Sequence, residues 1–218
     1  MKKIREVEIA FDKYADKYDE WYIKHREVFI NELKVLKSLK LKGRGLDIGV
    51  GTGILSSKIN IEVGIDPSVK MIKIAKKRME VIRAIGEKLP FKSSTFHYVL
   101  MIATLCFLEN PIQTLKEAWR VLKENGLIVT CIIPKDSKWG MEYEKKKYEG
   151  HKIYRHANFR CIKEVNELLR KAGFSIIEYK STLSYGPHEK AKIENPSENI
   201  RDKGFISVSY THLTLPTN

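Results

Sequence analysis

The chain has 218 residues, 43% of them hydrophobic and 31% charged, which is enough for one α/β-sized domain with a substantial core. Its formal net charge of +13 at pH 7 would suit a polyanionic partner, but the lysines are spread over nearly every segment, so we interpret them as a solvated surface. No apolar stretch approaches the ~20 residues of a membrane span, and the charged start does not resemble a signal peptide, so we expect a cytoplasmic protein.

Residues 9–40 are predicted to form two helices. Aromatic side chains recur in the first at steps of three and four residues, which places them on one face. They are Phe11, Tyr14, Tyr18 and Tyr22, with Trp21 beside them. A stripe of this kind is most often buried on the body of the domain. The second helix also has an apolar face, and we expect it to pack on a sheet.

A glycine-rich turn follows the first predicted strand, in the sequence Gly45-Leu46-Asp47-Ile48-Gly49-Val50-Gly51-Thr52-Gly53, and a helix is expected to begin at residues 54–58. Three glycines in five positions allow positive φ and the close approach of a ligand to the backbone. Dinucleotide-binding turns have their third glycine one position further on, where this chain has Ile54. The spacing therefore argues against NAD.

Each of the next two predicted strands leads into an acidic residue. Asp66 closes strand 61–66, and a carboxylate there can accept hydrogen bonds from two ribose hydroxyls. It could instead cap the helix that is expected to begin at Pro67. Glu87 follows strand 81–85 and can accept from an adenine amino group, or it is an exposed loop acid. Both positions suit a cofactor that contains a nucleoside.

The rest of the chain alternates strands with helices, which predicts βαβ units and a mostly parallel sheet. Strands are expected at 96–102, 127–133, 174–179 and from 204, and helices at 111–122 and 162–172. Residues 134–159 break the pattern with a polar, basic stretch. Because such an insertion lies over the ligand crevice of these sheets, we interpret 134–160 as a substrate cover. The alternative is an ordinary surface loop.

The last residues differ in composition from the rest. Residues 208–218 contain no charged side chain and resemble a translated sequencing-adaptor string. We therefore predict that residues 208–218 are a non-native tail and that the single domain ends at residue 207. The last strand would then be truncated or replaced.

Several ordered motifs resemble those of class I S-adenosylmethionine-dependent methyltransferases. They are the turn from Leu46 to Gly53, the segment from Gly64 to Ser68 with Met71, and the segment from Gly86 to Phe91. Weaker likeness at 11–21, 121–127 and 168–174 extends the resemblance over residues 10 to about 206. Within this class the chain is most similar to the small-molecule group that includes the ubiquinone and menaquinone C-methyltransferases.

The resemblance implies a Rossmann-like α/β fold, with a seven-stranded, mostly parallel sheet of order 3-2-1-4-5-7-6 and helices on both faces. It implies S-adenosylmethionine as cofactor and S-adenosylhomocysteine as product. The three glycines would lie beside the methionine moiety, Asp66 on the ribose and Glu87 near the adenine. The helices of residues 1–42 would cover the cofactor. The implied cofactor residues are Tyr14, Tyr18, Asp47, Gly49, Val50, Gly51, Gly53, Asp66, Pro67, Met71, Gly86, Glu87, Lys88, Ala103 and Thr104.

Two residues depart from the family pattern. His97 stands where relatives usually have Asp, which is expected to change a hydrogen bond at the base of the fourth strand without touching the cofactor. Cys161 stands where Ser or Thr is usual, so a poorer helix cap is expected there.

Methyl transfer from a sulfonium is an in-line displacement that depends mainly on positioning, so no catalytic residue is assigned. His151 and His156 could act as a general base, but a surface histidine is the more frequent case. The three cysteines, at 106, 131 and 161, have no metal-ligand spacing, and no metal is expected. Trp21, Trp139 and Tyr154 are the candidate substrate contacts.

We therefore expect an enzyme that methylates a small molecule by in-line displacement. An RNA or protein methyltransferase is the first alternative, because of the positive charge. A basic surface gathered around the crevice would favour that alternative. A protein that binds S-adenosylmethionine without catalysis is the second alternative.

Overall fold

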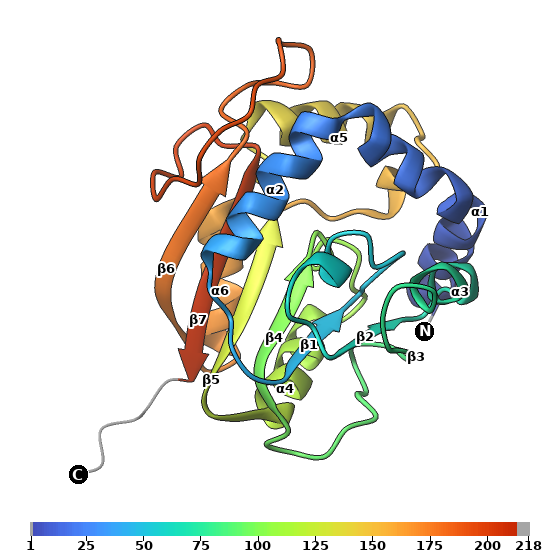
Figure 1. Cartoon of the computed structure of the whole chain (residues 1–218). Coiled ribbons are helices and arrows are strands. Elements are labelled where there is room, and N and C mark those ends of the chain that lie inside the picture. The colour runs from blue at the N-terminus through green and yellow to red at the C-terminus, as the bar shows by residue number, and fades with distance from the viewer. Residues whose placement is uncertain (1, 213–218) are drawn as a thin grey trace.

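The computed structural model describes residues 2–212 and contains a seven-stranded sheet of order β3-β2-β1-β4-β5-β7-β6 (Figure 1). Every neighbouring pair is parallel except those made by β7, which runs antiparallel to β5 and β6. The predicted fold class and strand order are confirmed. The strands are β1 Gly45–Ile48, β2 Val63–Asp66, β3 Val81–Arg83, β4 Phe96–Ile102, β5 Leu122–Ile132, β6 Phe174–Thr182 and β7 Phe205–His212.

Helices cover both faces of this sheet (Figure 1). Buried side chains of α4 and α6 pack on one face in a core that includes Leu115 and Leu169, and those of α2 pack on the other with Val35. The helices are α1 Lys2–Lys24, α2 Arg26–Ser38, α3 Val69–Ala75, α4 Pro111–Val121, α5 Lys138–Tyr148 and α6 Ile162–Lys171, with short 3-10 turns η1 Ser56–Lys58 and η2 Tyr154–His156.

The chain order of the strands reverses beside β1. From β1 the chain adds β2 and β3 on one side, and then returns to add β4 and β5 on the other. Loops that leave the carboxyl ends of β1 and β4 therefore diverge, which leaves a crevice at this edge of the sheet. Helices α1 and α2 arch over that edge together with α5 (Figure 1).

The predicted elements differ from the structure in three places. Residues 54–58 form only the 3-10 turn η1, and Pro67 precedes the helix, whose N-cap is Ser68. The expectation of an irregular stretch at 134–159 is wrong, because α5 lies within it. This helix buries only Trp139, Gly140 and Tyr143, so its narrow apolar face gave little periodicity to detect.

The strand β7 includes residues 208–212, which the sequence assigns to a non-native tail. Val208 and Tyr210 are fully buried between β5 and β6. Residues 208–212 therefore complete the sheet, and their native or foreign origin stays a prediction. The remaining part of that tail, residues 213–218, lies outside the described residues.

The two departures from the family pattern lie away from the crevice. His97 is exposed, and its ring Nδ1 accepts a hydrogen bond from the Arg44 amide at 2.9 Å. At the start of α6, Glu164 accepts a hydrogen bond from the backbone amide of Cys161 at 2.8 Å, which satisfies that end of the helix.

Candidate cofactor and acceptor site

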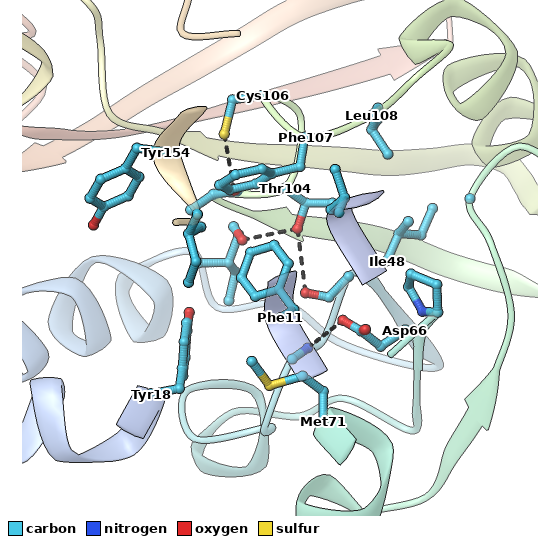
Figure 2. Close-up of a pocket in the computed structure, with 18 of the residues that line it drawn as sticks. Phe11, Tyr18, Ile48, Asp66, Met71, Thr104, Cys106, Phe107, Leu108 and Tyr154 are labelled. Atoms are coloured by element: carbon cyan, nitrogen blue, oxygen red, sulfur yellow. Dashed lines mark hydrogen bonds between the residues drawn. The ribbon is translucent and has the colours of Figure 1, made fainter. Parts of the chain in front are cut away.

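A cavity of about 350 Å³ lies where the carboxyl ends of the parallel strands meet. Its floor includes Ile48 of β1, Ile65 of β2 and Ile102 of β4, and Phe205 joins them because β7 runs antiparallel and begins at the same edge. Helix α1 forms the opposite wall (Figure 2). The cavity therefore occupies the crevice that the strand order predicts.

The glycine turn forms part of the cavity wall. Gly49, Gly51 and Gly53 have φ of 77°, 56° and 72°, which only glycine adopts without strain. A Cβ on Gly49 would lie 2.5 Å from Thr104, whereas a Cβ on Gly51 would meet no protein atom within 4 Å. Gly51 lines the cavity, so a side chain there would occupy space that a bound molecule could use.

The third glycine has a different role. A Cβ on Gly53 would lie 3.3 Å from the Met79 sulfur, so this residue packs toward α3 and does not line the cavity. Val50 is 7% exposed and packs on Gly64, also outside the lining. Two of the three glycines, Gly49 and Gly51, therefore line the cavity.

Asp66 ends β2 and faces the turn. Its Oδ2 accepts from the Gly51 amide at 3.0 Å and its Oδ1 accepts from the Ser68 amide at 2.8 Å, as Figure 2 shows for the first bond. Helix α3 is capped by the Ser68 hydroxyl instead, which accepts from the Met71 amide. Each Asp66 oxygen keeps a second lone pair, so the carboxylate can still receive two hydroxyls. Burial raises the pKa of Asp66 to about 6.

Asp47 lies beneath the turn, not in the cavity wall. It is 1% exposed, its Oδ2 accepts a short hydrogen bond from the Ser56 hydroxyl, and its Oδ1 has no hydrogen-bond partner among the described residues. Burial raises the pKa of Asp47 to about 7. This carboxyl group ties β1 to η1 and so supports the turn from behind.

The end of the cavity near β3 combines the third motif with an apolar wall. Gly86 and Glu87 line it together with Pro67 and Met71, while Lys88 is exposed and outside the lining. Glu87 Oε1 accepts from the Asn110 amide at 3.2 Å. The apolar wall comes from Phe11 of α1 and from Phe107, whose rings meet edge to face at 5.0 Å, and from Leu108 (Figure 2).

Ala103 and Thr104 follow β4 and lie between the two ends of the cavity. Ala103 has φ of 50°, and its amide already donates to the Cys131 carbonyl at 2.8 Å. The Thr104 hydroxyl donates to the Ile102 carbonyl at 3.0 Å (Figure 2). The Ala103 carbonyl accepts a hydrogen bond from the Cys106 thiol at 3.4 Å and keeps a second lone pair, which would suit a cationic ligand.

Aromatic side chains line the other end of the cavity. Trp21 of α1 and Tyr154 of η2 are two of the three predicted substrate contacts, whereas Tyr14 and Tyr18 of α1 are predicted to contact the cofactor. Tyr18 and Tyr154 lie on the same side of the view in Figure 2, away from Asp66. The candidate contact Trp139 does not line the cavity.

Trp139 is instead a core residue. It is 4% exposed, and its indole Nε1 donates to the Tyr185 carbonyl at 2.6 Å. Of the two histidines of the cover, His151 lines the cavity and stacks on the Tyr154 ring at 4.5 Å, whereas His156 does not line it. Burial lowers the pKa of His151.

Glu32 is one of the cavity residues that the sequence did not reveal, and it is the most deeply buried acid among them. It lies on α2, is 5% exposed, and its Oε2 accepts from the Tyr22 hydroxyl at 2.9 Å. Burial raises the pKa of Glu32 to about 8, against the opposing effect of the Tyr22 bond. The signal was its spacing, because it lies four residues after Val28 and four before Leu36, both buried.

Within residues 2–212, no group of three or more His, Cys, Asp or Glu side chains is placed to hold a metal ion. The same residues include no helix with the length and apolar content of a membrane span. The three cysteines are free thiols, and burial raises the pKa of Cys106, which lines the cavity.

Several known proteins have similar sequences. A family described as "Methyltransferase domain" matches residues 46–130, which include the glycine turn and Asp66. An uncharacterized protein of Methanocaldococcus jannaschii is 43% identical over 92% of this chain and 97% of its own length. A ubiquinone/menaquinone C-methyltransferase of Klebsiella pneumoniae is 26% identical over 78% of this chain and 68% of its length.

A solved structure covers nearly the whole chain. It belongs to a Thermotoga maritima protein described as a "SAM-dependent methyltransferase, possible histamine N-methyltransferase". The two chains are 37% identical with a TM-score of 0.87, over 93% of this chain and 98% of the other. The similarity thus includes both the cofactor motifs and the helices that cover them.

Proposed function

This chain belongs to the class I S-adenosylmethionine-dependent methyltransferases, and we propose that it methylates a small molecule held at the aromatic end of its cavity. Its cofactor is S-adenosylmethionine, the cofactor of the family. The observation that carries the proposal is the continuity of one cavity, which runs from Asp66 and Glu87 to Tyr18 and Tyr154. A cofactor bound at one end would direct its reactive group toward the other.

The residues of the first end fit the cofactor. We propose that Asp66 accepts from the ribose hydroxyls, that Glu87 lies near the adenine, and that Phe11 and Leu108 contact the adenine ring. Gly51 would lie against the methionine moiety, where a side chain would fill the cavity. When bound, the cofactor supplies an electrophilic methyl group on a sulfonium.

The charge of the cavity supports a small molecule over RNA as the acceptor. Among the described residues that line it, Lys146 is the single Lys or Arg, while Glu32, Asp66, Glu87 and Glu109 are acidic. A site that holds a phosphate backbone gathers cations around its entrance. The basic groups of Lys3, Lys147 and Arg160 lie near Cys106 of the lining, so the acidic lining itself, and not the surface around it, supports a small molecule. A cytoplasmic location stays our prediction.

Titration calorimetry with S-adenosylhomocysteine, S-adenosylmethionine and NAD tests the cofactor. We expect binding of the first two and none of NAD; tighter binding of NAD would contradict the proposal. Turnover is then followed as release of S-adenosylhomocysteine over panels of small molecules, RNA and proteins. Turnover on RNA or protein alone would indicate an RNA or protein methyltransferase. Cofactor binding without turnover on any panel would indicate a protein that binds S-adenosylmethionine without catalysis.

A further inference from the structure

The acceptor end of the cavity is built as a chamber of aromatic side chains around one carboxyl group. We call it the aromatic chamber, formed by Tyr18, Trp21, Tyr22, Tyr143, Tyr154 and Phe159. Tyr143 and Tyr154 stack at 4.5 Å, and Trp21 meets Tyr22 edge to face at 5.2 Å. Four separate elements or loops contribute these rings, so the chamber exists only in the folded chain.

Glu32 is the carboxyl group of this chamber, and half of it is without a protein partner. Its Oε2 accepts from Tyr22, whereas its Oε1 makes no hydrogen bond with any described residue. No Lys or Arg forms an ion pair with it among residues 2–212. Glu32 is nonetheless 5% exposed and lines the cavity.

Such a carboxyl group is costly to the fold. Burial of a carboxyl without a cation disfavours its charged form, and the raised pKa of Glu32 reflects that cost. Its neighbours on the helix face, Val28, Val35 and Leu36, show that an apolar residue would suit the same packing. A binding role gives a physical reason for a carboxyl group at this position.

We propose that Glu32 and the aromatic chamber bind a basic nitrogen, so that the methyl acceptor is an amine. The proposal rests on the proposed function and deepens it by naming the acceptor class. Electron-rich ring faces attract a cation, and a desolvated carboxylate adds a charge-assisted hydrogen bond. The hydroxyl protons of Tyr18 and Tyr22 stay in place, because burial raises the pKa of both.

The proton balance of the reaction gives Glu32 a second use. An amine enters as an ammonium ion, which has no free lone pair. This cation favours the charged form of Glu32, which releases its own proton to solvent, and one proton then passes from the ammonium nitrogen to the Glu32 carboxylate. The C–N bond forms as the C–S bond breaks, and the electron pair of that bond stays on sulfur. The product leaves as a methylated ammonium ion, and Glu32 keeps its proton until the next ammonium ion enters.

Tyr18 is the chamber residue that links this end of the cavity to Asp66. Burial raises its pKa, and the carboxyl groups of Glu32 and Asp66 both act in the same direction. The Thermotoga maritima neighbour, described with an amine acceptor, gives a separate reason to test amines, but the inference depends on Glu32 of this chain.

The test compares two probes of nearly equal shape, 2-phenylethylamine and 2-phenylethanol. Their binding to the full chain is measured by calorimetry at pH 8 with saturating S-adenosylhomocysteine. We expect the amine to bind at least about tenfold more tightly than the alcohol. Glu32→Gln should weaken amine binding by about tenfold to a hundredfold and leave alcohol binding within about twofold.

Glu27→Gln is the matched control. It removes the same charge from the same helix, and Glu27 does not line the cavity, so neither probe should change its affinity. Equal or absent binding of both probes by the parent, or an unchanged amine affinity in Glu32→Gln, would overturn the proposal.

Binding of S-adenosylhomocysteine separates this inference from the proposed function. Unchanged affinity for it in Glu32→Gln shows that the variant is folded with an intact cofactor end. If the parent failed to bind S-adenosylhomocysteine, the proposed function would be contradicted. The binding of 2-phenylethylamine and 2-phenylethanol, measured again without S-adenosylhomocysteine, would still decide whether the chamber selects an amine.

Discussion

The two ends of the cavity are built in different ways. The cofactor end uses backbone turns and single acids that follow consecutive strands, such as Gly51 after β1 and Asp66 at the end of β2. The acceptor end uses side chains from helices far apart in the sequence, such as Tyr18, Glu32 and Tyr143. A fixed backbone suits the site that we propose for the shared cofactor, whereas side chains from separate helices can differ between proteins and suit the site that we propose for the acceptor.

The largest expected effect tests whether the cofactor end depends on its backbone. Gly49→Ala should lower the free energy of unfolding by about 2–5 kcal/mol, because it combines a positive φ with a collision. Its Cβ would lie 2.5 Å from Thr104. Chemical denaturation measures the loss.

Gly150→Ala is the control for this substitution. Gly150 has φ of 79°, close to the 77° of Gly49, but a Cβ there meets no protein atom within 4 Å. It should cost only about 1–2 kcal/mol. Equal losses in the two variants would show that the contact with Thr104 is unimportant.

The next effect concerns Asp66, whose side chain we propose to bind the ribose of the cofactor. Asp66→Ala should weaken S-adenosylhomocysteine binding by about 1.5–3 kcal/mol for each ribose hydrogen bond that is lost. Unchanged affinity in calorimetry would show that Asp66 only supports the turn. The acceptor end, which Asp66 does not line, should still distinguish the amine probe from the alcohol.

The Asp66 carboxyl group also predicts that the affinity for S-adenosylhomocysteine depends on pH. A ribose hydroxyl donates to the carboxylate form, and burial places the pKa of Asp66 at about 6. The affinity for S-adenosylhomocysteine should therefore fall as the pH drops below about 6 and level off above it. Asp66→Asn cannot titrate at this position, so a fall of the same size in that variant would assign the dependence to another group.

A third effect tests whether the buried carboxyl group of Glu32 lowers the stability of the fold. Glu32 has a pKa of about 8 when folded against 4.5 as its ordinary value, so the folded chain holds an extra proton between these values. Its contribution to stability is then fully present below pH 4.5 and is lost as the pH rises toward about 8. In Glu32→Gln the free energy of unfolding should not fall in this way as the pH rises, because Gln does not titrate.

At pH 8 we expect Glu32→Gln to be about 1–2 kcal/mol more stable than the parent, after allowance for the buried amide. Denaturation at a series of pH values measures it, and the difference should vanish near pH 4. A variant that is less stable at every pH would indicate that Glu32 is retained for the fold.

The smallest effect separates the chamber from the core behind it. Trp139→Phe loses the indole hydrogen bond to the Tyr185 carbonyl, which should cost about 1 kcal/mol of stability. Binding of the amine probe should not change, because Trp139 does not line the cavity. Weaker amine binding with unchanged stability would restore Trp139 as an acceptor contact.

Several residues that the sequence proposes for the cofactor lie together at one cavity because the signals that identify them are local, and their role in cofactor binding stays a prediction. Glycine spacing, strand ends and the acids beside them lie within a few residues of one another, and Gly49, Gly51, Asp66 and Glu87 all line the cavity. It predicted Gly53, Val50 and Lys88 less well, because the motif does not distinguish residues that face the cavity from those that pack behind it. Side-chain direction, not spacing, separates the two groups.

The sequence by itself determined the sheet, its strand order through the family resemblance, and the cofactor, since these depend on periodicity and on motifs at strand ends. Only the tertiary structure decided which residues line the aromatic chamber that we propose for the acceptor. Trp139 lies in the core, His151 lies at the cavity, and Glu32 of α2 lies beside Tyr22 of α1. The physical reason is that the chamber forms from contacts between separate helices, and no single stretch of the chain contains it.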